Sequence, residues 1–245
     1  ATGILLVKHE LMNPMLATGF YGDMARMRSQ VKVEQALVGI TALSLKRDGD
    51  EWSVNPGETL KTLSGGTEMP LNGIVAGKSK AIGTTANRSV LRTAWNSVIL
   101  SESGYDQYFG DIRFADKQYQ PSFMQWESFT GESPYLYGWI VETSEDFSNA
   151  QKLIGPGRLK RGGIALAQQN GKAVLYSTDR RPNGCLYKFV SNSADNLEEG
   201  VVYVANLENS NWIELSVSDS LLSNYFNNRE QMLTELSVAG KLAGG

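Results

Sequence analysis

Short apolar runs alternate with turn residues along most of the chain, and this pattern predicts β-strands. The runs contain β-branched and aromatic residues and are bounded by Gly, Asn, Asp and Ser. We expect strands over residues 3–7, 37–46, 98–101, 137–142, 163–167, 172–177, 185–190 and 201–205. The pattern therefore indicates an all-β protein.

Several connections carry strong turn signals. Asn170 and Gly171 both tolerate positive φ, so they predict a type I′ turn that joins residues 163–167 to 172–177. Asn183 and Gly184 predict a second hairpin, between residues 172–177 and 185–190. Successive hairpins of short strands favour a sandwich, a barrel or a propeller over a βαβ fold.

The C-terminal part changes period. From Ser218 onward the apolar positions fit one face of a helix, with Ser218 or Asp219 as the cap. These positions are Leu221, Leu222, Tyr225, Phe226, Met232, Leu233 and Leu236. We find no repeat from which propeller blades could be counted and no low-complexity linker, so residues 1–245 are interpreted as a single domain.

Composition narrows the function classes. The 245 residues carry a net charge of −3, which does not favour a nucleic-acid partner. No run of 18 apolar residues predicts a membrane span, and the N-terminal residues lack the basic region of an intact signal peptide. One Cys and one His exclude an intrachain disulfide framework and a Cys/His zinc site, and Cys185 is interpreted as a packed apolar residue.

Acidic residues stand at the ends of several predicted strands. Glu10, beside His9, follows the first strand, and Glu102, Glu142 and Asp179 end or follow later ones. Calcium collects six to eight oxygen ligands from several chain segments, so these side chains are candidate ligands if they converge. The alternative for each is a solvated carboxylate in a loop, and for His9 and Glu10 a polar turn after an edge strand.

Basic residues cluster near the same strand ends. The planar guanidinium of arginine can bind a phosphate through two hydrogen bonds, so a phosphorylated ligand is one hypothesis. The alternative is surface charge beside turns. The residues concerned are Arg88, Arg92, Arg158, Lys160, Arg161, Arg180 and Arg181.

Beyond these patterns, colinear segments covering nearly the whole chain resemble one family. The first is an apolar strand that ends in His9-Glu10 and is followed by Asn13-Pro14. The others are residues 39–54, 71–77, 83–84, 93–97, 101–103, 137–142, 157–160, 175–180, 186–191, 200–205 and 211–215. Together they resemble the PhoX-type alkaline phosphatases, a secreted bacterial family.

The resemblance implies a β-propeller with an iron and calcium cluster that hydrolyses phosphomonoesters. Carried over by position, His9, Glu10, Glu102, Glu142 and Asp179 would be metal ligands. Arg158 and Arg180 would neutralise charge on the phosphoryl group during catalysis. The resemblance also implies a secreted or periplasmic protein.

The chain departs from the family at several ligand positions. Arg88 and Ser101 stand where the family has cysteines, so we do not expect iron, whereas calcium could still bind Glu102, Glu142 and Asp179. The other replaced positions are Ser103, Arg161, Gly162, Thr178 and Arg180. A cluster held by many ligands is not expected to assemble when about half of them are lost.

Three hypotheses follow. The first is an active, metal-dependent phosphatase, and the second is a non-catalytic propeller that serves as a structural or ligand-binding subunit. The lost ligands favour the second over the first. In the third, the chain binds a phosphorylated ligand without turnover through Arg88, Arg158 and Arg180.

The length also differs from the family pattern. Family members have a further segment before residue 3 and more strands after the last helix. We therefore expect an incomplete propeller whose missing strands come from another segment or another chain, because unpaired sheet edges promote aggregation.

Overall fold

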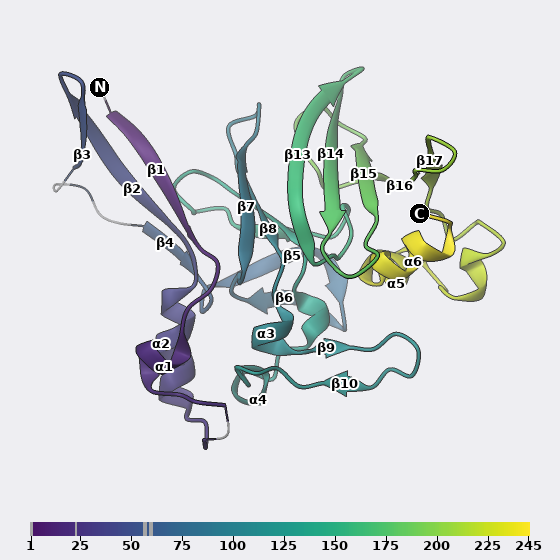
Figure 1. Cartoon of the computed structure of the whole chain (residues 1–245). Coiled ribbons are helices and arrows are strands. Elements are labelled where there is room, and N and C mark those ends of the chain that lie inside the picture. The colour runs from purple at the N-terminus through teal and green to yellow at the C-terminus, as the bar shows by residue number, and fades with distance from the viewer. Residues whose placement is uncertain (1, 23, 56–57, 59–60) are drawn as a thin grey trace.

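Antiparallel pairing builds most of the fold (Figure 1). The computed structural model describes residues 2–22, 24–55, 58 and 61–245. Within these residues, strands form a four-stranded, a six-stranded and a five-stranded sheet and one two-stranded ribbon, and no sheet closes into a barrel. The prediction of a mainly β fold is confirmed, whereas the propeller arrangement stays a prediction.

The N-terminal sheet contains the first predicted strand. Its strands are β1 (Thr2–His9), β2 (Gly39–Asp48), β3 (Glu51–Val54) and β4 (Lys61–Ser64), and β2 pairs with each of the other three. The strand predicted to start at residue 37 begins at Gly39, because helix α2 (Arg28–Leu37) occupies the preceding residues. Gly39 has φ +120°, and a Cβ there would lie 2.1 Å from the Leu63 carbonyl oxygen, so this junction requires glycine.

The central sheet joins a two-stranded hairpin to a four-stranded antiparallel unit. Its order is β6 (Lys78–Ile82), β5 (Glu68–Val75), β12 (Gln151–Leu153), β11 (Ile140–Thr143), β8 (Val98–Glu102) and β7 (Asn87–Arg92). All neighbours are antiparallel except β12 and β5, which run parallel with Lys152 opposite Leu71. The strand predicted over residues 137–142 starts only at Ile140, because the 3₁₀ helix η1 (Pro134–Leu136) and the bend over residues 137–139 come before it.

The five-stranded sheet is a meander. It runs in chain order through β13 (Arg161–Gln169), β14 (Lys172–Asp179), β15 (Leu186–Ser191), β16 (Gly200–Asn206) and β17 (Asn211–Glu214). Asn170 and Gly171 have φ of 53° and 70°, which confirms the tight turn between β13 and β14. The second predicted hairpin, between β14 and β15, is confirmed as well.

Short helices and a ribbon complete the chain. They are α1 (Pro14–Thr18), α3 (Asp106–Phe109), β9 (Asp111–Ile112), β10 (Tyr119–Gln120), α4 (Glu127–Thr130), η2 (Leu222–Asn224), α5 (Arg229–Thr234) and α6 (Leu236–Leu242). The single helix predicted from Ser218 is therefore wrong in extent. Asp219 accepts hydrogen bonds from the Leu221 and Leu222 amides and starts only a short 3₁₀ turn, and Asn228 caps α5.

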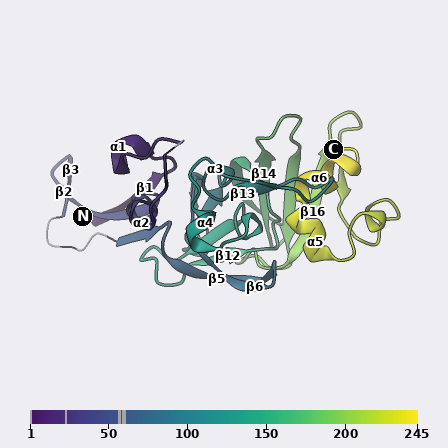
Figure 2. The same ribbon diagram turned by 90° about the horizontal axis from the view of Figure 1, so that it is seen from below.

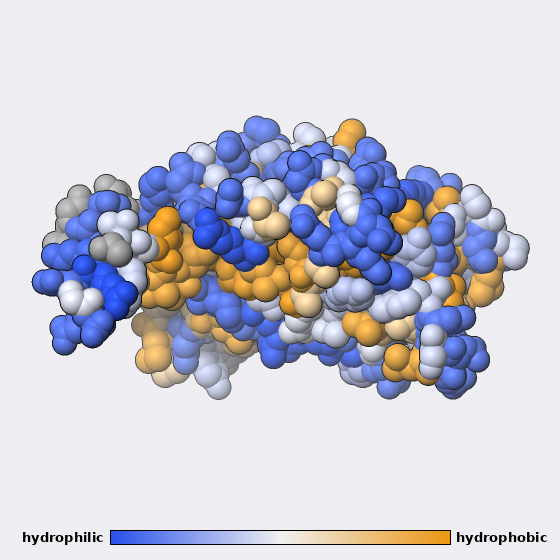
Figure 3. All heavy atoms as spheres, turned by 90° about the horizontal axis from the view of Figure 1, so that it is seen from above, coloured by the Kyte–Doolittle hydropathy of each residue, from blue (hydrophilic) through white to orange (hydrophobic). Residues whose placement is uncertain are grey.

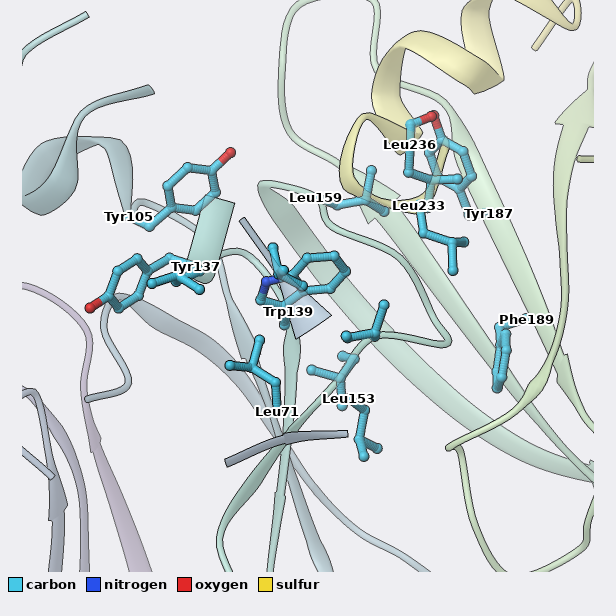
Figure 4. Packing of buried hydrophobic residues seen from close by; sticks show 14 of the residues in the cluster. Leu71, Tyr105, Tyr137, Trp139, Leu153, Leu159, Tyr187, Phe189, Leu233 and Leu236 are labelled. Carbon is cyan, nitrogen blue, oxygen red and sulfur yellow. The ribbon is translucent and has the colours of Figure 1, made fainter. Parts of the chain in front are cut away.

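The main core lies between the central and five-stranded sheets and beneath the C-terminal helices. Figure 4 shows Trp139 and Leu153 at its centre, with Tyr187 and Leu236 on the side of the C-terminal helices. Aromatic rings extend it toward α3, where Phe109 stacks on Tyr137 with the ring centres 3.7 Å apart. A smaller cluster around Ile40, Leu63 and Leu100 joins the N-terminal sheet to the central one.

A buried carboxylate anchors the N-terminal helices to this body. Glu34 of α2 is fully buried and accepts hydrogen bonds from the Thr18 hydroxyl (2.6 Å), the Trp126 indole (2.9 Å) and both terminal nitrogens of Arg26. The Arg26 Nε donates to the Met124 carbonyl oxygen at 3.0 Å. These contacts compensate the burial of both charges and fix α1 and α2 against the segment around Trp126.

The three large sheets lie in sequence along the molecule. Figure 2 shows the N-terminal sheet with α1 and α2 at one end, and the five-stranded sheet with α5 and α6 at the other. Figure 3 shows an apolar band on the opposite face, beginning beside the N-terminal sheet. Among the described residues, no helix is long and apolar enough to cross a bilayer.

Candidate functional site

Glu102, at the end of β8, is the most deeply buried of the predicted ligands. Its Oε2 accepts hydrogen bonds from the backbone amides of Gly138 (2.9 Å) and Trp139 (3.2 Å), and its Oε1 accepts one from Lys152 Nζ at 2.8 Å. Both side chains of this ion pair are fully buried. Burial lowers the pKa of Lys152, and the neighbouring Glu102 carboxylate opposes that shift. Both Glu102 oxygens are thus already bonded to groups of the protein itself.

Lys152 is also held from two further sides. Its Nζ donates to the Leu136 carbonyl oxygen at 3.0 Å and lies 4.0 Å from the centre of the Tyr137 ring. The ammonium group therefore contacts a carboxylate, a carbonyl oxygen and an aromatic face, which together replace its lost hydration.

A second cation lies beside this pair. Arg161, the first residue of β13, is fully buried and donates to the carbonyl oxygens of Gly138 (2.7 Å), Pro156 (3.2 Å) and Gly157 (2.5 Å). Burial lowers the pKa of Arg161 to about 10, while the charges of Glu102 and Asp179 oppose the shift. Arg161 therefore remains cationic at neutral pH and fills this space with a positive charge.

Arg158 and Asp111 form a third charged group. The Arg158 guanidinium donates to Asp111 Oδ1 at 3.0 Å and to the carbonyl oxygens of Tyr137 and Pro134, and lies 4.4 Å from the centre of the Tyr105 ring. Lys160 Nζ lies 3.2 Å from the other Asp111 oxygen. Burial would raise the pKa of Asp111, but Arg158 and Lys160 lower it to about 2.

Asp179 lies opposite Arg161 in the β13–β14 pair. Its carboxylate is buried and accepts hydrogen bonds from the backbone amide of Arg181 (3.2 Å) and from the Arg181 guanidinium (3.3 Å and 3.4 Å). Arg181 also donates to the Tyr105 hydroxyl at 2.8 Å. Asp179 is thus a counterion of an arginine.

Two of the replaced ligand positions, Arg88 and Arg180, lie at the surface. Arg88 donates to Glu10 Oε1 and to the Gly162 carbonyl oxygen, each at 3.1 Å, which brings β7, β13 and the end of β1 together. Arg180 is exposed and donates to the buried Ser103 hydroxyl at 3.4 Å. Two guanidinium groups, those of Arg88 and Arg180, therefore lie where β7, β13 and the end of β14 meet the solvent.

The remaining candidates lie elsewhere. His9 Nε2 is 3.0 Å from the Thr41 hydroxyl within the N-terminal sheet. Glu142 accepts hydrogen bonds from the Trp95 indole (2.7 Å) and the Ser97 hydroxyl (2.5 Å). Ser101, at a family cysteine position, is buried and accepts a hydrogen bond from the Ser89 amide.

These side chains do not form one cluster. Glu142 pairs with Ile99, three residues before Glu102 on β8, which separates the two carboxylates by about 10 Å along the strands. Among the residues that the structure describes, no group of three or more His, Cys, Asp or Glu side chains could hold a metal ion. The ligand roles assigned by position to His9, Glu10, Glu102, Glu142 and Asp179 stay predictions.

Sequence reasoning missed the residues that organise this region. Lys152, Asp111 and Tyr105 were not singled out, although Lys152 directly precedes the apolar pair Leu153 and Ile154. A charged residue next to such a run is the one signal that could have suggested a buried partner. The chain offers no comparable local signal for Asp111.

The low pKa of Asp111 predicts an acid-dependent loss of stability. Because its pKa is about 2 in the folded protein against 3.8 ordinarily, the carboxylate stabilises the fold fully above about pH 4, and this contribution disappears as the pH falls toward 2. We expect Asp111→Asn to lower the free energy of unfolding by about 2 kcal/mol at pH 7 and by much less near pH 2.5. Urea denaturation across this range measures the difference. Asp48→Asn, at an exposed position, is the control, and a cost of Asp111→Asn that does not change with pH would contradict the assignment.

Comparison of the chain with known proteins identifies its family. A solved structure described as Pseudomonas fluorescens PhoX in complex with vanadate, a transition state analogue, superposes on the chain with a TM-score of 0.80 at 21% sequence identity. The match covers 100% of this chain but 52% of that one, so this chain spans about half its length. No curated protein sequence matches significantly. The family model described as alkaline phosphatase PhoX matches residues 1–245, and the chain therefore belongs to the PhoX alkaline phosphatase family.

Proposed function

We propose that this chain is a non-catalytic part of a PhoX-type propeller, in which the family's iron and calcium cluster does not assemble from the described residues. The observation that carries the proposal is the buried Glu102–Lys152 ion pair. The Glu102 carboxylate already accepts three hydrogen bonds, and the buried ammonium group 2.8 Å from Oε1 holds the position that a cation would need and repels one placed beside it.

The charges around this pair support the same conclusion. Arg161 is buried and interacts with the charges of both Glu102 and Asp179, and its own positive charge repels a metal ion at short range. Asp179 and Glu10 each bind an arginine instead. The donor set of the described residues therefore does not fit a cluster of iron and calcium, nor the calcium site predicted on Glu102, Glu142 and Asp179.

The family activity is the competing function. PhoX-type enzymes are metal-dependent phosphatases, and an active chain would need its metal ligands in a rearranged site or from another polypeptide. Family membership also supports a secreted or periplasmic location, which we propose for this protein on that basis alone.

Metal content and turnover separate the two functions. We expect the purified protein, measured by plasma mass spectrometry, to contain far less than one iron or calcium ion per chain, and to show no hydrolysis of p-nitrophenyl phosphate above that of Glu142→Gln. The reason is that Glu102 is paired with Lys152 and Asp179 is paired with Arg181. Stoichiometric iron and calcium, with hydrolysis that a chelator abolishes, would restore the active phosphatase.

A phosphorylated ligand is a second candidate function. Arg180 is exposed, and 45% of the Arg88 side chain is exposed, so a phosphomonoester in solution could reach both guanidinium groups without any rearrangement of the core. Arg158, in contrast, is buried and already donates to Asp111 and two carbonyl oxygens, so we do not propose it as a phosphate contact.

Substitution of Arg180 tests whether the protein binds phosphate at this position. We expect inorganic phosphate to bind the protein weakly and Arg180→Gln to weaken the binding about tenfold, because a charge-assisted hydrogen bond is lost. NMR titration at low ionic strength measures both affinities. Arg92→Gln, which removes an exposed arginine paired with Glu145, is the control. Equal affinities in the wild-type protein and both variants would exclude a phosphate site at Arg180.

The N-terminal region points to a protein partner. Of the 18 large apolar side chains that are exposed among the described residues, 12 lie in residues 2–54, and α1 buries none of its residues. They are Ile4, Leu5, Leu11, Met15, Leu16, Tyr21, Met24, Met27, Val33, Leu37, Trp52 and Val54. We propose that a β-rich polypeptide covers this surface and completes the fold, since the matched structure is about twice as long.

The partner proposal predicts self-association of the isolated chain. Because β1 is an edge strand with Ile4 and Leu5 exposed, we expect concentration-dependent oligomers in light scattering and binding of a hydrophobic dye. Ile4→Ser with Leu5→Lys should reduce both signals. Leu207→Ser, at an exposed leucine outside this region, should not. A stably folded monomer that binds no dye would contradict the proposal.

A further inference from the structure

A cavity of about 700 Å³ opens where the segment joining β9 to β10, the η1 turn and α5 meet. Its volume lies within the range of small-molecule binding sites. Phe114, Tyr135, Tyr225 and Phe226 form its aromatic walls. None of the predicted ligands or catalytic arginines lines it, so it is distinct from the region around Glu102.

The aromatic walls are partly fixed and partly open. Phe226 is buried and packs against Phe114 with the ring centres 5.7 Å apart. Tyr135 donates its hydroxyl to Glu235 at 2.8 Å, whereas Tyr225 is half exposed at the opening. Aromatic faces carry negative electrostatic potential, so such walls favour a cation.

The charged residues that line the cavity also favour a cation. Glu230 and Glu235 both line it, and Lys117 is the one basic residue among its lining residues. Outside the lining, Arg158 lies 5.3 Å from the Tyr135 ring centre and is paired with Asp111, which also lies outside the lining and contacts Lys160. Among the lining residues that the structure describes, the two carboxylates therefore outnumber the single ammonium group.

Lys117 shows how a cation can be accommodated there. Its ammonium group lies 4.1 Å from the centre of the Phe114 ring and 3.4 Å from Glu235 Oε1. That oxygen contact is longer than the roughly 2.8 Å of a strong charge-assisted hydrogen bond, and 59% of the Lys117 side chain is exposed. The lysine therefore occupies an ammonium position without being tightly held in it.

We propose that this cavity binds an organic cation, a primary ammonium group carried on an apolar body, and that Lys117 is an intrinsic competitor for the ammonium position. The apolar body would pack on Phe226 and Tyr225, and the ammonium group would contact Phe114, Glu230 and Glu235. The proposal does not depend on the state of the metal-ligand positions.

Three isosteric probes test the charge preference. We expect phenethylammonium to bind at least about fivefold more tightly than neutral 2-phenylethanol and anionic phenylacetate, because only the cation gains the aromatic and carboxylate contacts. NMR titration of the full chain measures the three affinities. Equal binding of the alcohol would overturn the cation site, and tighter binding of phenylacetate would show instead that Lys117 recruits an anion.

Variants test the residues. Lys117→Met should tighten phenethylammonium binding about fivefold by removing the competitor, and Glu230→Gln, at an exposed position, should weaken it by a similar factor. Lys80→Met, which removes an exposed lysine paired with Glu68, is the control. Phe114→Leu should also weaken phenethylammonium binding, because it removes an aromatic face without changing the charge of the cavity. Unchanged affinity in Lys117→Met and Glu230→Gln would overturn the proposal.

Discussion

The buried ion pair between Glu102 and Lys152 is the interaction on which the interior of this protein depends. One carboxylate connects the end of β8 to the backbone of Gly138 and Trp139 and to β12. A buried ion pair gains little over an apolar pair, but losing one partner costs about 3–5 kcal/mol because the other charge is stranded. The two positions are therefore coupled, because a substitution at either one strands the charge at the other. A metal ion at Glu102 would be repelled by the Lys152 ammonium group, which lies 2.8 Å from Oε1.

The residues around this pair place positive side chains beside buried acceptor groups. Arg161 and Arg158 are buried against backbone carbonyl oxygens, so these buried acceptors receive their hydrogen bonds from guanidinium groups of the chain itself. In a metal centre, converging carboxylates repel one another and the bound cation relieves that repulsion. Here arginines and a lysine already provide the positive charge. The electrostatic balance around Glu102 is thus achieved by side chains of the described residues themselves.

Local chemistry accounts for what the sequence could predict. The β13–β14 hairpin followed from Asn170 and Gly171, whose tolerance of positive φ determines the turn without any tertiary contact. Pairings between distant segments, such as β8 with β11, have no comparable signal, so the separation of Glu102 from Glu142 could not be foreseen. Similarly, strand ends identify Glu102 as a candidate residue, but its partner lies 50 positions away and becomes visible only in three dimensions.

The parallel contact between β12 and β5 has a kinetic consequence. Leu71 and Lys152 are opposite each other in this joint, and the whole β7–β8–β11 unit lies between them in the sequence. Contacts across such long loops form late, because the entropy of closing the loop must be spent before they contribute. The hairpins on either side can form early, whereas the continuous six-stranded sheet can exist only after both are complete. Lys152 reaches Glu102 through the pairing of β12 with β11 and of β11 with β8, so the buried carboxylate can be neutralised before β5 joins the sheet.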